Sequence, residues 1–407
     1  MVFGLCMDSD VFLRLFGGLN VGSGSGQASL VHSGNSNPIL FGFTVTLIAL
    51  GICTMLPIYR TVLQTLFSVP WLAALYVECL VSMLWSVDLA TTFRYSITLW
   101  AYLACALGFT YFTSIKQALA TIGNTVFGLA LLSIAIEFIA PHHTSVPGWS
   151  GVYGEKNHLG IGMTIGMIAV AVPRERWTLV RIAKLLVMSI LLMLSQSGTA
   201  LVVTVISAYL LVLLRCNLRF RKLWLILPVV FLVTAAVVVP NFIDHLFALG
   251  GKNTTFTGRD TIWAFSFNQW MAKFFLGWGY TAFWISQEDL ITQSLGWNPL
   301  SAHNGILDTG LALGIVGVLF TVGIVIAAFR EGFYVRKYVS EESGTWLLIS
   351  LVVLLVHNMM ETDFLIPAPL WFVFTASYFA AQRSRHCYKA NVAGVFSSQF
   401  SPGPVEA

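Results

Sequence analysis

The chain has 407 residues, of which 57% are hydrophobic and only 10% are charged, and its formal net charge is +4. A soluble globular protein carries about 25% charged residues, so this composition excludes an ordinary soluble domain. The small net charge gives no indication of a nucleic-acid partner. We therefore expect an all-α, polytopic integral membrane protein.

Eleven apolar stretches are candidate bilayer-spanning helices, for which roughly 20 residues are typical, with a range of about 17–25. In chain order they are Pro38–Leu56, Thr65–Trp85, Tyr95–Thr113, Ala118–Ala140, Leu159–Pro173, Arg181–Leu194, Thr199–Leu214, Leu223–Pro240, Gly305–Phe329, Trp346–Met360 and Leu365–Ala381. The sixth and seventh are close to the lower length limit. These two could instead form one bent segment.

The positions of the cations predict the orientation, because cationic loops stay on the cytoplasmic side. With eleven spans, one side holds 16 of the 22 Lys and Arg residues. The other six are Arg14, Arg94, Lys156, Lys252, Arg259 and Lys273. The C-terminus is then cytoplasmic and the N-terminus extracytoplasmic, unless Val11–Leu19 contains a further partial segment. We expect no signal peptide, because no basic region or clear cleavage site accompanies the first apolar stretch.

The predicted organisation has five parts. They are an extracytoplasmic or interfacial segment (1–37), a first transmembrane bundle (38–240), a large extracytoplasmic loop with short helices (241–304), a second bundle (305–382) and a disordered cytoplasmic tail (383–407). The six cysteines are scattered without a CxxC pair, so we interpret them as small core residues. The sequence shows no internal repeat, which disfavours transporters built from inverted halves.

The first candidate motif is Gly151-Val-Tyr-Gly-Glu-Lys-Asn-His158, which directly precedes a predicted span. Its glycines allow close backbone approach, and Lys156 and Asn157 offer hydrogen-bond donors to an oxyanion. An ordinary interfacial turn with a snorkelling lysine is the alternative. Because four polar residues are packed together at a membrane boundary, we favour a substrate-binding role.

The second motif, Thr257-Gly-Arg-Asp260, predicts a helix start that resembles a capping box. Trp263, Phe267, Trp270 and Phe274 then follow on one helical face, which we expect at the membrane interface. Arg259 falls in the first turn, where free N–H groups and the helix dipole attract anions. A guanidinium there suits phosphate. The alternative is that Arg259 only pairs with Asp260 or a lipid headgroup.

The third motif, Ser301-Ala-His-Asn-Gly305, opens a predicted span. A neutral His303 at the water interface can accept a proton near physiological pH, and Asn304 could orient it or a sugar hydroxyl. A lone histidine is more often structural, and the neighbouring motifs are what favour catalysis here. Asp308 follows on the same helix and is a candidate partner for His303 or Asn304.

Other ionisable residues support a polar site in the bundle. Glu78 and Glu137 fall within predicted spans, and Glu361 and Asp363 fall at an outer turn. Such groups are costly in a membrane and often functional. Arg94 follows Trp85-Ser-Val-Asp88 on the outer side and could close the same pocket.

The order of these motifs resembles the O-antigen ligase and polymerase superfamily, and most closely its exopolysaccharide polymerisation proteins of the ExoQ type. The motifs that carry the resemblance are Trp85-Ser-Val-Asp88, Gly154-Glu-Lys-Asn157, Ser195-Gln-Ser-Gly-Thr199, Gly258-Arg-Asp260 with Gly277-Trp-Gly-Tyr280, and Ala302-His-Asn-Gly305. The resemblance runs from roughly Trp85 to Asp363, most of the chain. Many relatives have an arginine near the position of Gly198, which this chain lacks, so one phosphate contact expected in the family is in doubt.

The resemblance implies an inverting glycosyltransferase without metal or cofactor, on the outer face of a bacterial inner membrane. Its donor would be a glycan linked through pyrophosphate to undecaprenol. Arg259 would contact the pyrophosphate, His303 would activate the acceptor hydroxyl, and Lys156, Asn157, Asn304, Arg94 and Glu361 would bind substrate. Membrane lipid, a flippase and a chain-length regulator are the expected partners.

Three functions stay open at this stage. A polysaccharide polymerase is our leading hypothesis, and an O-antigen-type ligase that uses lipid A core or a protein as acceptor is the alternative enzyme. A transporter of an anionic or sugar solute would explain the spans and buried acids. It would not explain an outer loop with an arginine at a helix start.

Overall fold

The computed structural model describes residues 49, 53, 59–139, 148–216 and 259–399, and within these residues every regular element is a helix. The predicted spans at 38–56 and 223–240 lie outside the described residues, apart from residues 49 and 53. The helices in chain order are α5 (Tyr59–Phe67), α6 (Pro70–Val81), η2 (Ser82–Leu84), α7 (Leu89–Phe112), α8 (Ile115–Ile139), η3 (Gly151–Tyr153), α9 (Lys156–Ala171), α10 (Leu179–Ser195), α11 (Gly198–Arg215), α13 (Arg259–Ala272), α14 (Ala282–Ser286), α15 (Glu288–Leu295), α16 (Gly305–Tyr338), α17 (Glu341–His357) and α18 (Pro369–Gln399).

Four of the described helices are long and apolar enough to cross a membrane: α7, α8, α11 and α16. Pro70–Leu84 forms a shorter apolar helix. The compact pair at residues 181–214 is two helices, α10 and α11, and not one bent segment. Its left-handed residue Gln196 ends α10, and the Ser197 hydroxyl then accepts from Ala200 N to begin α11.

Three predicted boundaries were wrong. The stretch predicted as one span at 65–85 is broken at Ser68–Val69, because Pro70 occupies the start of α6 and lacks the N–H that a continuous helix needs there. Helix α7 begins at Leu89 and not at residue 95, because the Asp88 carboxylate caps it by accepting from Thr91 N at 3.0 Å. Arg94 therefore lies within a helix and not in a loop.

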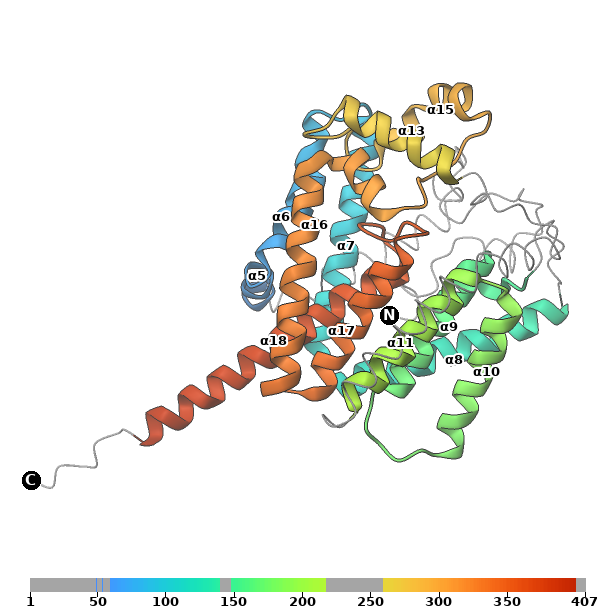
Figure 1. Ribbon diagram of the computed structural model, residues 1–407. Helices are drawn as coiled ribbons and strands as arrows, with labels where there is room; N and C mark the ends of the chain where they lie inside the picture. The colour runs from blue at the N-terminus through green and yellow to red at the C-terminus, as the bar shows by residue number, and fades with distance from the viewer. Residues whose placement is uncertain (1–48, 50–52, 54–58, 140–147, 217–258, 400–407) are drawn as a thin grey trace, which may run out of the picture.

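The third correction concerns the tail predicted to be disordered from residue 383. Helix α18 continues through these residues to Gln399 (Figure 1). Arg383 donates to Thr110 O at 2.6 Å and Arg385 to Glu331 Oε2 at 2.5 Å. These contacts anchor the helix where the sequence composition alone suggested a loose tail.

The helices pack around two central elements. Helix α9 contacts α8, α10, α11 and α18, and α17 contacts α11, α16 and α18. Figure 1 shows α13 and α15 at one end of the molecule and the exit of α18 at the other. A small separate core lies beneath α13–α15 and joins them to α16. It consists of Ile262, Trp270, Phe283, Trp284, Ile291, Ala302 and Leu311.

Three rings of the predicted aromatic row, Phe267, Trp270 and Phe274, contact one another in sequence, but the row does not all face outward. Trp270 is buried and stacks on Phe274 with ring centroids 6.2 Å apart, while the Trp263 indole donates to Ala302 O. Phe267 is exposed. The tryptophans of this row therefore attach α13 to the protein.

Helix α16 is kinked at Gly314, whose φ of 66° and ψ of −161° are essentially restricted to glycine. The kink frees carbonyl groups that a straight helix would satisfy. Leu311 O and Ala312 O instead accept from Trp278 N at 2.8 Å and Gly279 N at 3.0 Å, and Ile315 N donates to Phe274 O at 2.8 Å. The segment 274–280 thus supplies the hydrogen-bond partners that the kinked helix lacks, because backbone polar groups within a membrane must be satisfied by the protein.

The same segment also contacts the corner between α6 and α7. The Trp85 indole donates to Leu276 O at 2.8 Å, and Val87 N donates to Trp278 O at 3.1 Å. Tyr280 N donates to Ser82 Oγ at 3.0 Å. The motifs Trp85-Ser-Val-Asp88 and Gly277-Trp-Gly-Tyr280 therefore have a shared structural role, and they fix the N-terminal part of α16 against the corner between α6 and α7.

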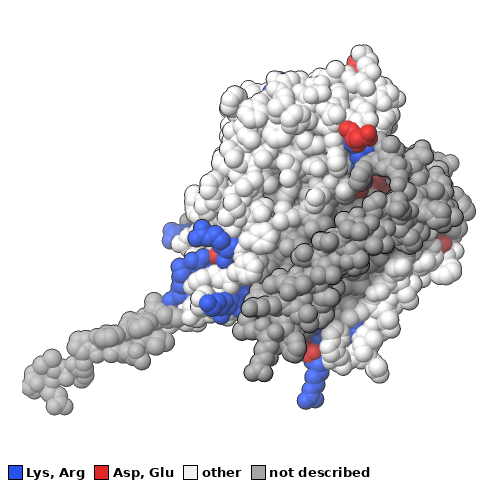
Figure 2. All heavy atoms as spheres, in the orientation of Figure 1, with Lys and Arg blue, Asp and Glu red and all other residues white. Residues whose placement is uncertain are grey.

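Arginines close the C-terminal ends of three helices. Arg181 Nε and Arg215 donate to Val170 O at 2.8 Å and Ala171 O at 3.0 Å at the end of α9. Arg336 donates to Leu214 O of α11, and Arg383 to Thr110 O of α7. Unpaired carbonyls and the negative end of the helix dipole both favour a cation there. Figure 2 shows Lys and Arg gathered at the end from which α18 leaves the bundle.

Candidate functional site

The candidate site lies where five chain segments meet, and three of them are the starts of α9, α11 and α13. Asn157 is in the first turn of α9. Its Oδ1 accepts from Ser197 Oγ at 2.9 Å, and Ser197 caps the start of α11. The α10–α11 turn thereby fixes the direction of the Asn157 amide, whose NH₂ group donates to Glu361 in the turn after α17.

The fourth segment is Ser301–Asn304, which precedes α16. Asn304 caps this helix, because its Oδ1 accepts from Ile306 N at 3.1 Å and Leu307 N at 3.2 Å. His303 has a φ of +49°, a left-handed conformation that is uncommon for a residue other than glycine. Such strain costs about 1–3 kcal/mol and persists only where the surroundings over-determine it. The backbone here is therefore held to aim the imidazole.

The fifth segment is the turn after α17, and Asn358 organises it. Asn358 Oδ1 accepts from Asp363 N at 2.9 Å and Phe364 N at 3.0 Å, and Asn358 O accepts from Gly305 N at 2.9 Å. A Cβ at Gly305 would overlap the Asn358 side chain. The close approach that this glycine permits brings the turn carrying Glu361 against the start of α16.

Glu361 is the centre of the site, since it bonds to three of the residues predicted from the sequence. Its Oε1 accepts from Asn157 Nδ2 at 3.0 Å and from an Arg259 guanidinium nitrogen at 3.2 Å. Its Oε2 lies 2.9 Å from His303 Nδ1. The Arg259 and Glu361 side chains are only 19% and 16% exposed, and His303 is 31% exposed. One carboxylate thus joins a guanidinium and an imidazole in a site largely shielded from water.

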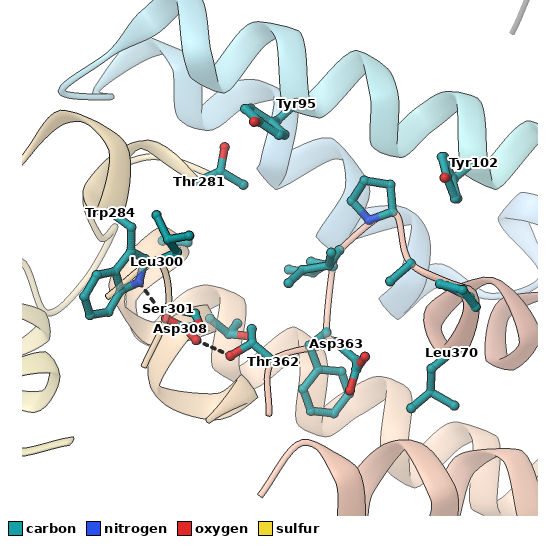
Figure 3. A pocket seen from close by; sticks show the side chains of 18 of the residues that line it. Tyr95, Tyr102, Thr281, Trp284, Leu300, Ser301, Asp308, Thr362, Asp363 and Leu370 are labelled. Atoms are coloured by element: carbon teal, nitrogen blue, oxygen red, sulfur yellow. Dashed lines mark hydrogen bonds between the residues drawn. The ribbon is translucent and has the colours of Figure 1, made fainter. Parts of the chain in front are cut away.

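Asp308 holds the two loops of this site together. Its carboxylate accepts from Ala302 N at 3.0 Å, next to His303, and from the Thr362 hydroxyl, next to Glu361. It also accepts from the Trp284 indole at 2.7 Å, as Figure 3 shows. We expected Asp308 to bind the side chain of His303 or Asn304. Instead it binds Ala302 and Thr362, the neighbours of His303 and Glu361. It thereby fixes the distance between the two segments that carry these residues.

The charges of the site shift the pKa of His303 and Glu361 in opposite directions. The hydrogen bond to Glu361 raises the pKa of His303, with the charge of Glu361 adding to it, and this outweighs burial. Burial by itself would raise the pKa of Glu361. The hydrogen bond and charge of His303 and the charges of Arg259 and His357 outweigh it, and they hold the pKa of Glu361 below its ordinary value.

The ionised Glu361 also selects the tautomer of His303. A carboxylate only accepts hydrogen bonds, so Nδ1 of His303 carries the proton that it donates to Oε2. Nε2 of the neutral ring is then the basic nitrogen. A His–carboxylate pair of this kind can take a proton from a hydroxyl group.

Lys156 and Arg94 were also predicted as site residues. Lys156 precedes Asn157 and lies against Gly148, where a Cβ would stand 3.2 Å from Lys156 Cδ. Arg94 is exposed on α7, with its guanidinium 5.1 Å from the centre of the Tyr95 ring. Asn304 uses its side-chain oxygen as a helix cap. Arg259, His303, Glu361 and Asn157 are thus the predicted residues that the structure brings into mutual contact.

A second imidazole–carboxylate pair follows in the same turn, between His357 Nδ1 and Asp363 Oδ2. Both residues are buried. The sequence analysis noted Asp363 but not its partner. Ser197, Asn358 and Trp284 were also missed as contributors to the site, because each acts through a residue distant in sequence. Among the described residues, no three His, Cys, Asp or Glu side chains are grouped as metal ligands.

A cavity of about 200 Å³ adjoins the cluster. One side of it is lined by Ser301 from the segment before α16, by Asp308 of α16, and by Thr362 and Asp363 from the turn after α17. Residues of α7, α8, α9 and α14 line other parts of the wall. Figure 3 shows these side chains around the open space. The candidate site therefore combines a largely shielded charged cluster with a neighbouring cavity.

Comparison with known proteins confirms the resemblance predicted from the motifs. A family model described as O-antigen ligase matches residues 183–322, a range that contains Arg259 and His303 but neither Asn157 nor Glu361. The chain is also 24% identical over 337 residues to the exopolysaccharide production protein ExoQ of Rhizobium meliloti (strain 1021). That match covers 76% of this chain and 76% of the relative.

Proposed function

We propose that this chain is a membrane polysaccharide polymerase, an inverting glycosyltransferase that needs no metal. It would transfer a growing glycan from undecaprenyl pyrophosphate to a lipid-linked repeat unit. The similarity to an exopolysaccharide production protein and to the O-antigen ligase family supports a polymerase or ligase role. The observation that carries the mechanism is the bridge by Glu361 between Arg259 and His303.

The proposed transfer is a single displacement. Nε2 of His303 accepts the proton of the acceptor hydroxyl as its oxygen attacks the anomeric carbon of the donor. The new C–O bond forms while the bond from that carbon to the pyrophosphate oxygen breaks, and the electron pair leaves with the pyrophosphate. Glu361 stabilises the imidazolium that results, and removal of such a base costs about 10²–10⁴-fold in rate.

Arg259 is the proposed contact for the departing pyrophosphate. A guanidinium at the start of α13 adds its charge to the positive end of the helix dipole. In the structure this charge is balanced by Glu361, with an N–O distance of 3.2 Å. A pyrophosphate must therefore compete with Glu361 for Arg259. Lys156 and Arg94 are proposed as further cations near the entry of the substrate.

We place the site on the periplasmic side of a bacterial inner membrane, where a polyprenyl donor presents its glycan. The gathering of Lys and Arg at the opposite end of the molecule supports this orientation, since cations are retained in the cytoplasm (Figure 2). Reporter fusions at Trp297 and at Tyr388 test it, and a cytoplasmic reporter signal at Trp297 would contradict the orientation. A flippase and a chain-length regulator are the proposed protein partners.

Reconstitution in vesicles with a lipid-pyrophosphate-linked repeat unit tests the activity. Wild-type protein is expected to form high-molecular-weight polymer, and Arg259→Ala and His303→Ala are expected to form none. Arg60→Ala and His386→Ala are matched controls, because both residues are exposed and lie far from the cluster in sequence. Polymer of normal length from either site variant, at equal protein levels, would refute the assignment.

A ligase is the second candidate, favoured by the description of the matching family. It predicts a single transfer to lipid A core or a protein, with no increase in product length when only the lipid-linked repeat is supplied. A transporter instead predicts movement of solute across the vesicle without any change in polymer length.

A further inference from the structure

The wall of the cavity beside the reactive cluster is mostly apolar, and it includes aromatic rings and a few polar groups. Aromatic rings of Tyr95, Tyr153 and Trp284 line it together with Thr281, Thr309 and Asp363. A sugar ring presents C–H groups on its faces and hydroxyls around its rim. Aromatic faces combined with a few fixed polar groups match both features.

Two hydroxyl groups of this wall, those of Tyr95 and Thr281, are shielded from solvent. Thr281 Oγ1 makes no hydrogen bond within the described residues, and the Tyr95 hydroxyl makes none of good geometry, with the Arg94 side chain as its neighbouring donor. Figure 3 shows the two hydroxyls turned toward one another at one side of the cavity. A buried polar group without a partner costs about 1–3 kcal/mol. Two shielded hydroxyls in one cavity, neither of them well bonded, indicate that a ligand with hydroxyl groups completes them.

The backbone of the wall is strained at two positions. Thr281 has a φ of 57° and Leu365 a φ of 59°. A left-handed conformation is a genuine outlier for a β-branched residue such as threonine. Thr281 is held there between Tyr280, whose hydroxyl donates to Leu365 O, and the start of α14. Strain of this kind is concentrated at ligand sites, where the surrounding structure enforces it.

The cavity lies on one particular side of the reactive cluster. Ser301, two residues before His303, and Thr362, next to Glu361, both line it. Among the described residues that line it, none comes from α13, the helix that carries Arg259. A ligand in the cavity is therefore beside the segment that carries His303 and the turn that carries Glu361, and not against the helix that carries the proposed pyrophosphate contact. Because His303 is the proposed base for the acceptor hydroxyl, the acceptor is the substrate expected on this side.

We infer that this cavity binds the terminal sugar of the acceptor glycan, with the Tyr95 and Thr281 hydroxyls as its hydrogen-bond partners. This inference rests on the proposed function and adds to it the site of the acceptor. A polyprenyl chain is the less suitable occupant, because it offers no hydrogen bond to the two shielded hydroxyls. A volume of about 200 Å³ also fits a sugar ring better than a long isoprenoid chain.

The test uses full-length protein in vesicles and measures polymerisation kinetics with Tyr95→Phe, Thr281→Val and the double variant. Each variant removes one hydroxyl and keeps the shape of the side chain. The Michaelis constant for the lipid-linked repeat is expected to rise about three- to tenfold for each hydroxyl removed, with kcat little changed. Tyr378→Phe and Thr321→Val are matched controls in α18 and α16, and both are expected to behave as wild type.

A competition experiment separates sugar from lipid. The probes are the lipid-free oligosaccharide repeat, released from the host polymer, and undecaprenyl phosphate. The double variant is expected to lose about tenfold or more in inhibition by the oligosaccharide and to retain inhibition by undecaprenyl phosphate. Unchanged inhibition by the oligosaccharide, or a loss confined to undecaprenyl phosphate, overturns the inference. Failure of the proposed function is distinguishable, because the wild-type protein would then make no polymer at all.

Discussion

Glu361→Gln is the sharpest test of the site, because one carboxylate serves two cations with different roles. The substitution keeps the shape of the side chain and removes its charge. His303 then loses the partner that fixes its proton on Nδ1, since the new amide can present either a donor or an acceptor to that nitrogen. We expect kcat to fall about 10²–10⁴-fold, the range for loss of a general base or of its correct tautomer.

The same substitution is expected to strengthen anion binding. Opposite charges about 4 Å apart attract by about 4 kcal/mol at an effective dielectric constant of about 20. Arg259, 19% exposed, loses this attraction to Glu361 and regains part of it from water. A net release of about 1.4 kcal/mol would make inorganic pyrophosphate about a tenfold better inhibitor. A loss of kcat combined with tighter anion binding is a signature that simple misfolding does not produce.

The pH dependence of kcat/KM supplies a third measurement. Glu361 raises the pKa of His303, and only the neutral ring can act as a base. Activity of the wild type therefore rises with pH through this raised pKa. In Glu361→Gln the pKa of His303 falls toward its ordinary value of about 6.5, so the acidic limb moves to lower pH. An unchanged acidic limb together with an unchanged kcat would refute the assignment of Glu361 and His303 as one unit.

Three further predictions concern the groups around this pair. Arg259→Lys keeps the charge but loses the planar fork, so transfer efficiency (kcat/KM) for the lipid-linked donor is expected to fall about tenfold or more in the vesicle assay. Asp308→Asn places an amide donor against the donors of Ala302, Trp284 and Thr362, so kcat is expected to fall about five- to hundredfold while the protein still inserts. Gly314→Ala is expected to lower the melting temperature in detergent, because its φ is 66° and a Cβ would overlap the Phe275 carbonyl. Gly128→Ala is the control, since a Cβ there would meet nothing within 4 Å, and this variant should melt like the wild type.

Local patterns in the sequence predicted much of the helical structure. Apolar runs located the helices because length and composition of a span are local properties, and α8 and α11 lie within a few residues of their predicted ranges. The predicted start at Gly305 agrees with α16, since capping residues act within one turn. The start predicted at Thr257 lies outside the described residues. Pro70 and Asp88 are local signals for a helix break and a helix cap. We nevertheless predicted one span across Pro70 and a later start for α7, because the surrounding apolar pattern is continuous.

Contacts between distant segments were not predictable in the same way. The structure brings together Arg259, His303 and Glu361, three residues that we predicted for the site, yet nothing local in the sequence states that a carboxylate 102 positions from Arg259 would join it to His303. The role of Asp308 was wrongly assigned for the same reason, because its partner Thr362 lies 54 positions away. The kink in α16 depends on hydrogen bonds to residues 274–280. The apolar pattern of the α16 sequence predicts a continuous helix and carries no information about these contacts.

The arginines at the helix ends have a consequence for biosynthesis. The last carbonyls of α7 receive their protein partner only when Arg383 is made, 273 residues after Thr110. Those of α11 likewise wait for Arg336, 122 residues after Leu214. Each early helix therefore leaves the ribosome with an unfinished end, which lipid headgroups or water must satisfy in the interim. The bundle is therefore completed late. It waits until α16 and α18, which carry Arg336 and Arg383, reach the cytoplasmic surface that we propose.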